Sequence, residues 1–254
     1  MRRYWSVPLL LALSAPCGAF NLGDLKGKLD ALNPPSAQHA AAPAASGLDR
    51  FSTQEQVSSL KQALNQGAEI AVRNLSKKNG YLNNAMVHIP LPENLQKADR
   101  ALRRVGLGKY SDELIAAMNH AAEAAVPEAR TLLLGAVKNM TVTDAKNILL
   151  GKDDAATQFF RHSTEAALSG KFKPVVVQSM QKVSLARAYD RFAGKGVKLG
   201  LVDEQDAHLD DYITRKALDG LFLMMAAEEK KIRAHPLQAT GDLARKVFAV
   251  LRGQ

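Results

Sequence analysis

Apolar and polar side chains follow a helical period along most of the chain. From Ser52 onward, apolar residues recur every three or four positions, which places them on one face of a helix. The spacing predicts a first helix that begins with a capping box at Ser52 and reaches about Lys77, with a stripe of Val57, Leu60, Leu64, Ala68, Ala71 and Leu75. No segment is a convincing strand by its alternation, so we expect an all-α fold.

Prolines predict the breaks between the next helices. Residues 79–95 are the least helical part of this region, and Pro92 suits the first position of a new helix. A continuous apolar stripe then covers residues 114–140, but Pro127 cannot donate a hydrogen bond to the carbonyl of Glu123. We therefore expect a kink or a division of the helix at Pro127.

Glycine and aspartate predict the helix boundaries that follow. A short helix over residues 143–150 is expected to close at Gly151, in a left-handed cap. Asp153 is expected to cap the next helix, which runs to about Leu168, and a separate helix begins near Phe172. The two helices would then be distinct elements.

The last third of the chain contains the most apolar helix. Ser184 is expected to cap a helix that the glycine cluster at 194–200 breaks, and a long helix then covers about 206–234. That helix is apolar on nearly every face, as expected of a helix surrounded by others. Together the patterns predict a single compact helical domain over residues 51–254, with about nine helices and this long central helix near the C-terminus.

Composition and charge narrow the function classes. The chain has 254 residues, of which 46% are apolar and only 6% aromatic, which favours packed helices over sheets. The formal net charge is +9, and it suggests affinity for an anionic envelope surface or lipid as a possible partner. No basic run with interleaved aromatics is present, so nucleic acid is not expected as a partner.

The first residues have the pattern of a targeting segment. Residues 1–19 combine a basic start, an apolar stretch and a small-residue cleavage site near Ala19, as in a signal peptide. We expect an exported, periplasmic protein whose mature chain has no transmembrane helix. Residues 20–50 resemble an Ala/Pro-rich leader or tether. A membrane-surface anchor is the less favoured alternative, because the segment is short and Lys26 and Lys28 are its only cations before Arg50.

Cys17 raises the question of lipoprotein anchoring. It is the one cysteine of the chain, and the residue before it is Pro16. A lipoprotein signal requires a small residue at that position, so acylation of Cys17 is not expected. Removal of Cys17 with the signal peptide would leave a mature chain that has no thiol for disulfides, catalysis or metal binding.

Three polar groups interrupt the apolar stripes and are weak candidates for a ligand site. Standard catalytic, zinc, calcium and phosphate-loop motifs are absent from the sequence, and neither a metal nor a cofactor is predicted. For each group a structural role, as a helix cap or an ion pair, is the competing interpretation. The candidates are Asn119, His120 and Glu123; Asp154, Thr157 and Arg161; and Asp219, Glu228 and Arg233.

Two of these candidates, Arg233 and Glu228, carry specific expectations. Glu229 and Arg233 have the spacing of an ion pair on one helix, and Glu228 follows the apolar stripe and would need a partner if it is buried. A groove bordered by Glu123, Asp154 and Glu228 is the hypothesis for a ligand site, since carboxylates recur there among apolar stripes.

Three function classes remain open from the residues alone. The first is a periplasmic helical binding or envelope-associated module. The second is an enzyme that uses buried Glu123, Asp154 and Glu228 with His120 as a proton carrier. The third is a protein that binds a lipid or membrane surface.

Several long segments resemble a known family. In chain order they are "MVHIPLPENL", "MNHAAEAAVPEA", "DAKNILLGKDDAATQFF", "YITRKALDGLFLMMAAEEKKIR" and "DLARKVF". They resemble the bacterial exported family catalogued as domain of unknown function 4197, over roughly residues 52–248. The resemblance implies a helical, signal-peptide or lipoprotein-type protein of Gram-negative bacteria, and it implies no established activity. Pro16 departs from the lipoprotein pattern of such members.

Overall fold

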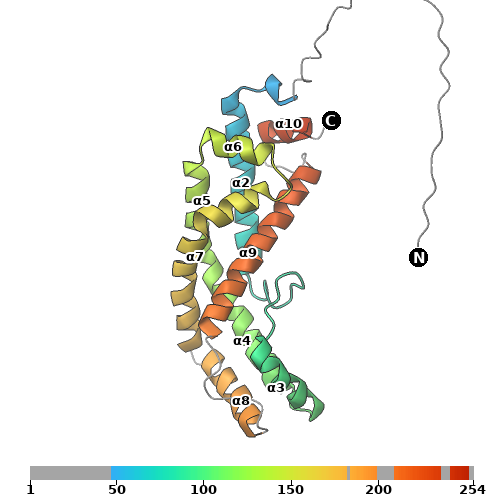
Figure 1. Ribbon diagram of the computed structural model, residues 1–254, viewed down its shortest axis with the longest axis vertical. Helices are drawn as coiled ribbons and strands as arrows, with labels where there is room; N and C mark the ends of the chain where they lie inside the picture. Colours follow the sequence, from blue (N-terminus) through green and yellow to red (C-terminus); the bar gives the residue numbers. More distant parts are fainter. Residues whose placement is uncertain (1–46, 182–183, 199–208, 236–240, 252–254) are drawn as a thin grey trace, which may run out of the picture. The chain divides into compact units, whose positions relative to one another are not determined.

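The computed structural model describes residues 47–181, 184–198, 209–235 and 241–251, and within these ranges it contains helices and no strand (Figure 1). The all-α prediction is confirmed, and the number of helices is close to the predicted one. The elements are η1 (Gly47–Arg50), α2 (Thr53–Ser76), α3 (Glu93–Arg104), α4 (Lys109–Ala125), η2 (Val126–Glu128), α5 (Ala129–Asn139), α6 (Val142–Leu149), α7 (Ala155–Gln181), α8 (Ser184–Lys198), α9 (Leu209–Ala234) and α10 (Asp242–Leu251). The predicted signal peptide, Cys17 and almost all of the predicted leader lie outside the described residues.

Two capping boxes begin helices of the domain. The hydroxyl of Ser52 accepts the backbone N–H of Glu55 at 3.2 Å, and the Glu55 carboxylate accepts the backbone N–H of Ser52 at 2.8 Å. This box, predicted from the sequence, starts α2 one residue later. Thr141 and Asp144 form an equivalent pair at the start of α6. The Thr141 box is a feature that sequence reasoning missed, although Thr-x-x-Asp is close to the usual capping pattern.

Pro127 divides the helix as predicted. The 3₁₀ turn η2 separates α4 from α5, and the chain continues in the helical region of backbone angles through Ala125, Val126, Glu128 and Ala129. Ala125, Val126 and Ala129 are completely buried. Pro127 and Glu128 are exposed, so the break lies at the surface while its neighbours on the inner side pack in the core.

Helix α7 differs from the prediction of two separate helices. It runs without interruption over Ala155–Gln181 and contains Pro174 in its interior. Proline at this position removes the hydrogen bond to the carbonyl of Gly170, but both residues are exposed, so water can satisfy that carbonyl. Phe172 and Val176 on the opposite side are fully buried, and their burial holds the two halves together.

Gly151 ends α6 for a reason other than the predicted one. Among the described glycines, positive φ angles occur at Gly106 and Gly241, and Gly151 does not have one. A Cβ atom on Gly151 would lie 2.5 Å from the carbonyl oxygen of Asn147 and 2.6 Å from Cβ of Ala155. Glycine is needed here because two helix ends approach closely. The left-handed cap was therefore a wrong prediction.

The predicted break at the glycine cluster after residue 193 is also wrong in part. Helix α8 continues through Gly194 and ends at Lys198. A glycine inside a helix costs only about 1 kcal/mol, which the burial of Ala188 and Phe192 offsets. The remainder of the cluster lies outside the described residues.

Helix α9 is the predicted central helix, but the other described helices do not surround it: Arg215, Leu223 and Lys230 are exposed on one side, so that part of the prediction is wrong. It packs against α2, α4 and α7, and Figure 1 shows it crossing α2 and lying beside α7. Its core-facing side is fully or almost fully buried at Ile213, Ala217, Leu221 and Phe222. Burial of each large side chain contributes about 2 kcal/mol, so α9 is held mainly by packing. Helix α9 carries Glu229 and Arg233 and packs against α4, which carries Asn119, His120 and Glu123.

Candidate functional site

Among the predicted candidates, Glu123 on α4 has the carboxylate with the most hydrogen-bond contacts. Its Oε1 accepts the backbone N–H groups of Tyr81 and Leu82 at 3.1 and 3.3 Å, and its Oε2 accepts the backbone N–H of Asn79 at 3.1 Å. His120, one turn earlier on α4, places Nδ1 2.8 Å from Oε2. The side chain of Glu123 is 7% exposed, so these four contacts occupy the usual acceptor positions of a buried carboxylate.

The backbone that Glu123 holds belongs to the α2–α3 connection, residues 77–92. Asn79 has a φ of 63°, a left-handed conformation that asparagine adopts more readily than most residues. Gly80 is required because a Cβ atom there would lie 2.6 Å from the carbonyl oxygens of Asn74 and Leu75. These two residues reverse the chain over the end of α2 and aim three N–H groups at Glu123.

Asn119 holds the other end of the same connection. Its Oδ1 accepts the N–H of Ile89 at 2.9 Å, and its Nδ2 donates to the carbonyls of Ile89 and Ile115 at 2.9 and 2.8 Å. The side chain is fully buried. An asparagine amide is suited to this position because it donates and accepts at once, as a strand neighbour would. The candidate group Asn119, His120 and Glu123 thus acts together on the α2–α3 connection.

Tyr81 fastens the connection to α9. Its hydroxyl donates to the carbonyl of Ala217 at 2.6 Å, and its ring lies against Gly220, where an added Cβ atom would be 2.6 Å from Cε1. Burial, with smaller contributions from the charges of Glu123 and Asp219, raises the pKa of Tyr81 far above its ordinary value. The side chain is therefore neutral at physiological pH and serves as a hydrogen-bond donor.

The outer side of this connection carries an open concavity of about 560 Å³. We call it the Lys/Asn concavity, and its lining residues are Asn74, Lys77, Lys78, Asn79, Gly80, Asn83, Asn84, Ala85 and Met224. The lining contains two cations and no acid. Lys77 and Lys78 are exposed, and neither ammonium group has an acidic partner within the described part of the chain. These residues are not among the candidates predicted from the sequence, although the polar cluster "KKNGYLNN" between two helices is a signal for a loop.

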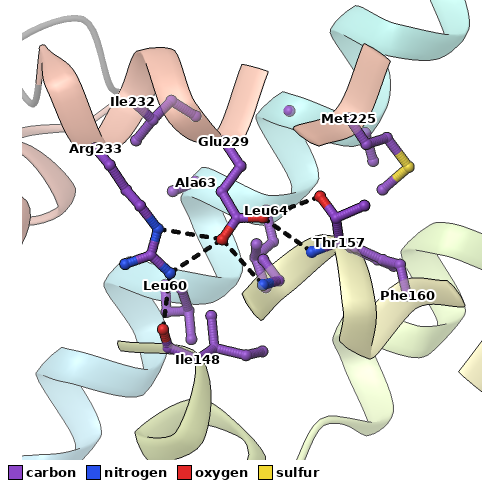
Figure 2. A pocket seen from close by; sticks show the side chains of 13 residues that line it. Leu60, Ala63, Leu64, Ile148, Thr157, Phe160, Met225, Glu229, Ile232 and Arg233 are labelled. Atoms are coloured by element: carbon purple, nitrogen blue, oxygen red, sulfur yellow. Dashed lines mark hydrogen bonds and ion pairs between the residues drawn. The ribbon is translucent and has the colours of Figure 1, made fainter. Parts of the chain in front are cut away.

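A second polar centre joins α6, α7 and α9 (Figure 2). The carboxylate of Glu229 accepts the N–H of Ala156 and both the N–H and the hydroxyl of Thr157, each at 2.9 Å. These N–H groups belong to the first turn of α7, so a residue of α9 caps that helix. Asp153, the predicted cap, is not the residue that satisfies them. The carboxylate of Asp154 instead accepts from Gln158 Nε2 at 3.0 Å.

Arg233 completes this centre from the same helix. Its Nε and Nη2 donate to Glu229 at 3.1 and 3.0 Å, as the spacing predicted, and Nη2 also donates to the carbonyl of Ile148 at 2.8 Å. Ile148 lies in the last turn of α6, where a cation complements the helix dipole. Glu229 and Arg233 therefore cap the start of one helix and the end of another.

A small cavity of about 30 Å³ adjoins this centre. Apart from Thr157, Glu229 and Arg233 its walls are apolar, and α2 contributes Leu60, Ala63, Leu64, Gly67 and Ala68. The volume is about that of one water molecule. The polar atoms of the wall already bond one another, so the rest of the wall offers an apolar surface.

The remaining candidates form separate contacts. Arg161 on α7 bonds Glu165 at 2.9 Å, lies 3.5 Å from Asp219 on α9, and stacks over the ring of Phe222 at 4.6 Å. Glu228 is buried and has the partner that burial was expected to require, since it bonds Lys231 at 2.7 Å.

The structure thus brings together some of the predicted residues and not others. Thr157 and Arg233 meet at Glu229, which was predicted only as an ion-pair partner, and Arg161 meets Asp219. No described hydrogen bond or ion pair links Glu123, Asp154 and Glu228 to one another. In the described ranges no three His, Cys, Asp or Glu side chains form a group that could hold a metal ion, and no helix has the length and apolar character needed to cross a membrane.

The fold and its contacts define a class: an all-α protein in which one buried carboxylate, Glu123, holds the segment that carries a basic, asparagine-rich concavity, and another, Glu229, caps a helix elsewhere. A family model described as "Protein of unknown function (DUF4197)" matches residues 50–249, which is most of the chain. The chain belongs to this family, and the resemblance seen in the sequence is confirmed. Comparison with curated proteins and with solved structures found no match.

Proposed function

We propose that this protein is a binding module of the bacterial cell envelope that takes an anionic ligand at the Lys/Asn concavity and performs no chemistry on it. The observation that carries the proposal is the attachment of the α2–α3 connection to Glu123. A buried carboxylate organises this segment from below, while its outer side presents two cations that have no acidic partner among the described residues.

The attachment matters for binding because it lowers the cost of ordering a loop. Glu123, Asn119 and Tyr81 fix the connection to α4 and α9 at several points along its length. A ligand that meets a loop already in place loses less conformational entropy on binding than one that must order it. The fixed position of the segment therefore favours a role in ligand recognition over a role as a flexible linker.

The lining of the concavity selects the chemistry of the ligand. Lys77 and Lys78 supply ammonium donors, and Asn74, Asn83 and Asn84 supply amides that both donate and accept. With no acid in the lining, an anion such as a phosphate or carboxylate group is the favoured partner. The asparagine amides suit polar atoms next to that group.

The contacts of the acids do not favour the rival proposal of an enzyme. A general base needs a free lone pair that reaches a substrate. Both oxygens of Glu123 accept two hydrogen bonds each, Glu228 bonds Lys231 on its own helix, and Asp154 bonds Gln158 four residues later. An active site that used all three would require these contacts to be exchanged.

An envelope location is part of the proposal and rests on the sequence. Residues 1–19 have the pattern of a signal peptide, and the net charge of +9 suits a compartment rich in anionic surfaces. Mass spectrometry of the purified N-terminus would test the cleavage expected near Ala19 and the fate of Cys17.

The binding proposal is tested by titrating the purified chain with inorganic phosphate and following backbone amide shifts by NMR. We expect saturable shifts at residues 77–85. The double variant Lys77→Gln/Lys78→Gln should weaken binding about tenfold or more, since two charge-assisted hydrogen bonds are lost. The control Lys146→Gln/Lys152→Gln removes the same charge from exposed positions elsewhere and should bind as the parent does. Equal weakening in both double variants, or shifts that never saturate, would contradict the proposal.

A further inference from the structure

A basic and apolar stripe follows one face of α9. Lys216, Leu223 and Lys230 are spaced by seven residues, so they lie nearly in line along the helix. Leu223 is 45% exposed and is one of the few large apolar side chains on the described surface with that exposure. Lys230 is exposed as well, and Lys216 is half-buried over the ring of Tyr212 at 5.9 Å.

The α2–α3 connection lies beside this stripe. The hydroxyl of Tyr212 donates to the carbonyl of Pro90 at 3.0 Å, and Asn84 Nδ2 lies 3.6 Å from Sδ of Met224. Tyr212 precedes Leu223 by eleven residues, which is about three helical turns, so it lies on the same side of α9. The connection therefore runs along the border of the stripe and carries the Lys/Asn concavity with it.

The connection adds a second exposed apolar side chain. Met86 is 54% exposed and follows Ala85, which lines the concavity, just as Leu223 precedes Met224, which also lines it. We define the basic face as Lys77, Lys78, Met86, Lys216, Leu223 and Lys230.

The acids close to this face on α9 each contact a basic side chain. Asp219 lies 3.5 Å from Arg161 of α7, which also bonds Glu165, and Glu228 bonds Lys231 at 2.7 Å. The basic face itself contains four lysines, two exposed apolar side chains and no acid. Lysines with apolar neighbours suit the boundary of an anionic bilayer, where ammonium groups meet phosphates and the apolar tips enter below the headgroups.

We infer that the basic face docks on a membrane surface bearing anionic phospholipids, with a lipid phosphate in the Lys/Asn concavity. The inference rests on the proposed function and extends it, since it names the lipid headgroup as the anion and adds Met86 and Leu223 as contacts. A soluble phosphate compound would use the concavity without the two apolar side chains.

The test is co-sedimentation of the purified chain, its N-terminus established, with vesicles at low salt. Vesicles of phosphatidylglycerol mixed with phosphatidylcholine are compared with vesicles of phosphatidylcholine alone. The variant Met86→Ser/Leu223→Ser removes the apolar contacts, and Val105→Ser/Leu150→Ser is its control, because Val105 and Leu150 are 59% and 70% exposed outside the basic face. Circular dichroism and thermal melting establish that each variant is folded.

Binding to the anionic vesicles is expected to exceed binding to phosphatidylcholine and to fall with added salt. Met86→Ser/Leu223→Ser should weaken it about tenfold, and the Val105→Ser/Leu150→Ser control should not. Equal binding to both vesicle types, or equal effects of both double variants, would overturn the inference. If phosphate still shifts the amides of residues 77–85 while vesicles do not bind, the lipid inference falls and the proposed function stands; loss of both refutes both.

Discussion

Glu229 on α9 caps Thr157 on α7: one carboxylate oxygen accepts both the backbone N–H and the hydroxyl of that residue at 2.9 Å. The same carboxylate accepts the N–H of Ala156 and is held by Arg233. A helix start that would otherwise need its own cap is thereby satisfied by a residue 72 positions away. Tertiary contact thus replaces the local cap at this junction.

Replacement of Glu229 by alanine is expected to lower the free energy of unfolding by about 3 kcal/mol or more, because it strands two buried N–H groups and the Arg233 guanidinium. Thr157→Val removes only the hydroxyl contact and should cost about 1 kcal/mol. Urea denaturation of both variants measures the difference. A Glu229→Ala variant as stable as Thr157→Val would show that the cap contributes little.

Gly220 and Gly67 offer a matched pair of helical glycines. An added methyl group at Gly220 would meet the ring of Tyr81 at 2.6 Å, whereas at Gly67 nothing lies within 4 Å. Gly220→Ala is therefore expected to destabilise the fold by about 1–3 kcal/mol through overpacking. Gly67→Ala should stabilise it by about 0.5–1 kcal/mol because it restricts the unfolded chain.

Thermal or urea unfolding of the two glycine variants provides the measurement. Effects of the same sign and size would mean that the connection does not pack on α9 as closely as the structure has it.

The raised pKa of buried Tyr81 predicts that the free energy of unfolding depends on pH in the alkaline range. Its pKa is raised in the folded state, so the stability it contributes is complete below the ordinary tyrosine pKa of 10.0 and declines as pH rises above that value, where only the unfolded chain ionises. Tyr81→Phe loses the bond to Ala217 and should cost about 1 kcal/mol at neutral pH. Above pH 10.0 this deficit should shrink, at most by about 1.4 kcal/mol per pH unit, and change sign about one unit higher.

Urea unfolding of the parent and Tyr81→Phe between about pH 8 and pH 11 tests this dependence. A constant difference over that range would refute a buried, neutral Tyr81.

The elements that local chemistry determines could be predicted from the sequence. The Ser52 capping box, the division at Pro127 and the central helix depend on neighbouring residues and on helical spacing, and all three are present. The continuity of α7 through Pro174 could not be predicted, because burial of Phe172 and Val176 outweighs a local break.

The candidate site was predictable only in part. The spacing of Glu229 and Arg233 indicated their ion pair, but nothing local shows that Glu229 reaches the first turn of α7. Likewise, the sequence marks Glu123 as unusual among alanines, while its partners at residues 79–82 are 41 to 44 positions away. Lys77 and Lys78 could not be predicted as site residues because exposed lysines are common, and their surroundings depend on the fold of the connection.

Glu123 is the residue on which the proposed binding site depends, and amide hydrogen exchange in Glu123→Gln tests that role most directly. Glutamine retains one acceptor oxygen, so the chain should fold while the N–H groups at residues 79–82 lose part of their support. We expect exchange at Asn79, Tyr81 and Leu82 to rise about tenfold or more, exchange at Leu221 of α9 to stay near the parent value, and phosphate binding to weaken. Unchanged exchange at residues 79–82 together with undiminished phosphate binding would contradict the claim that Glu123 builds the site.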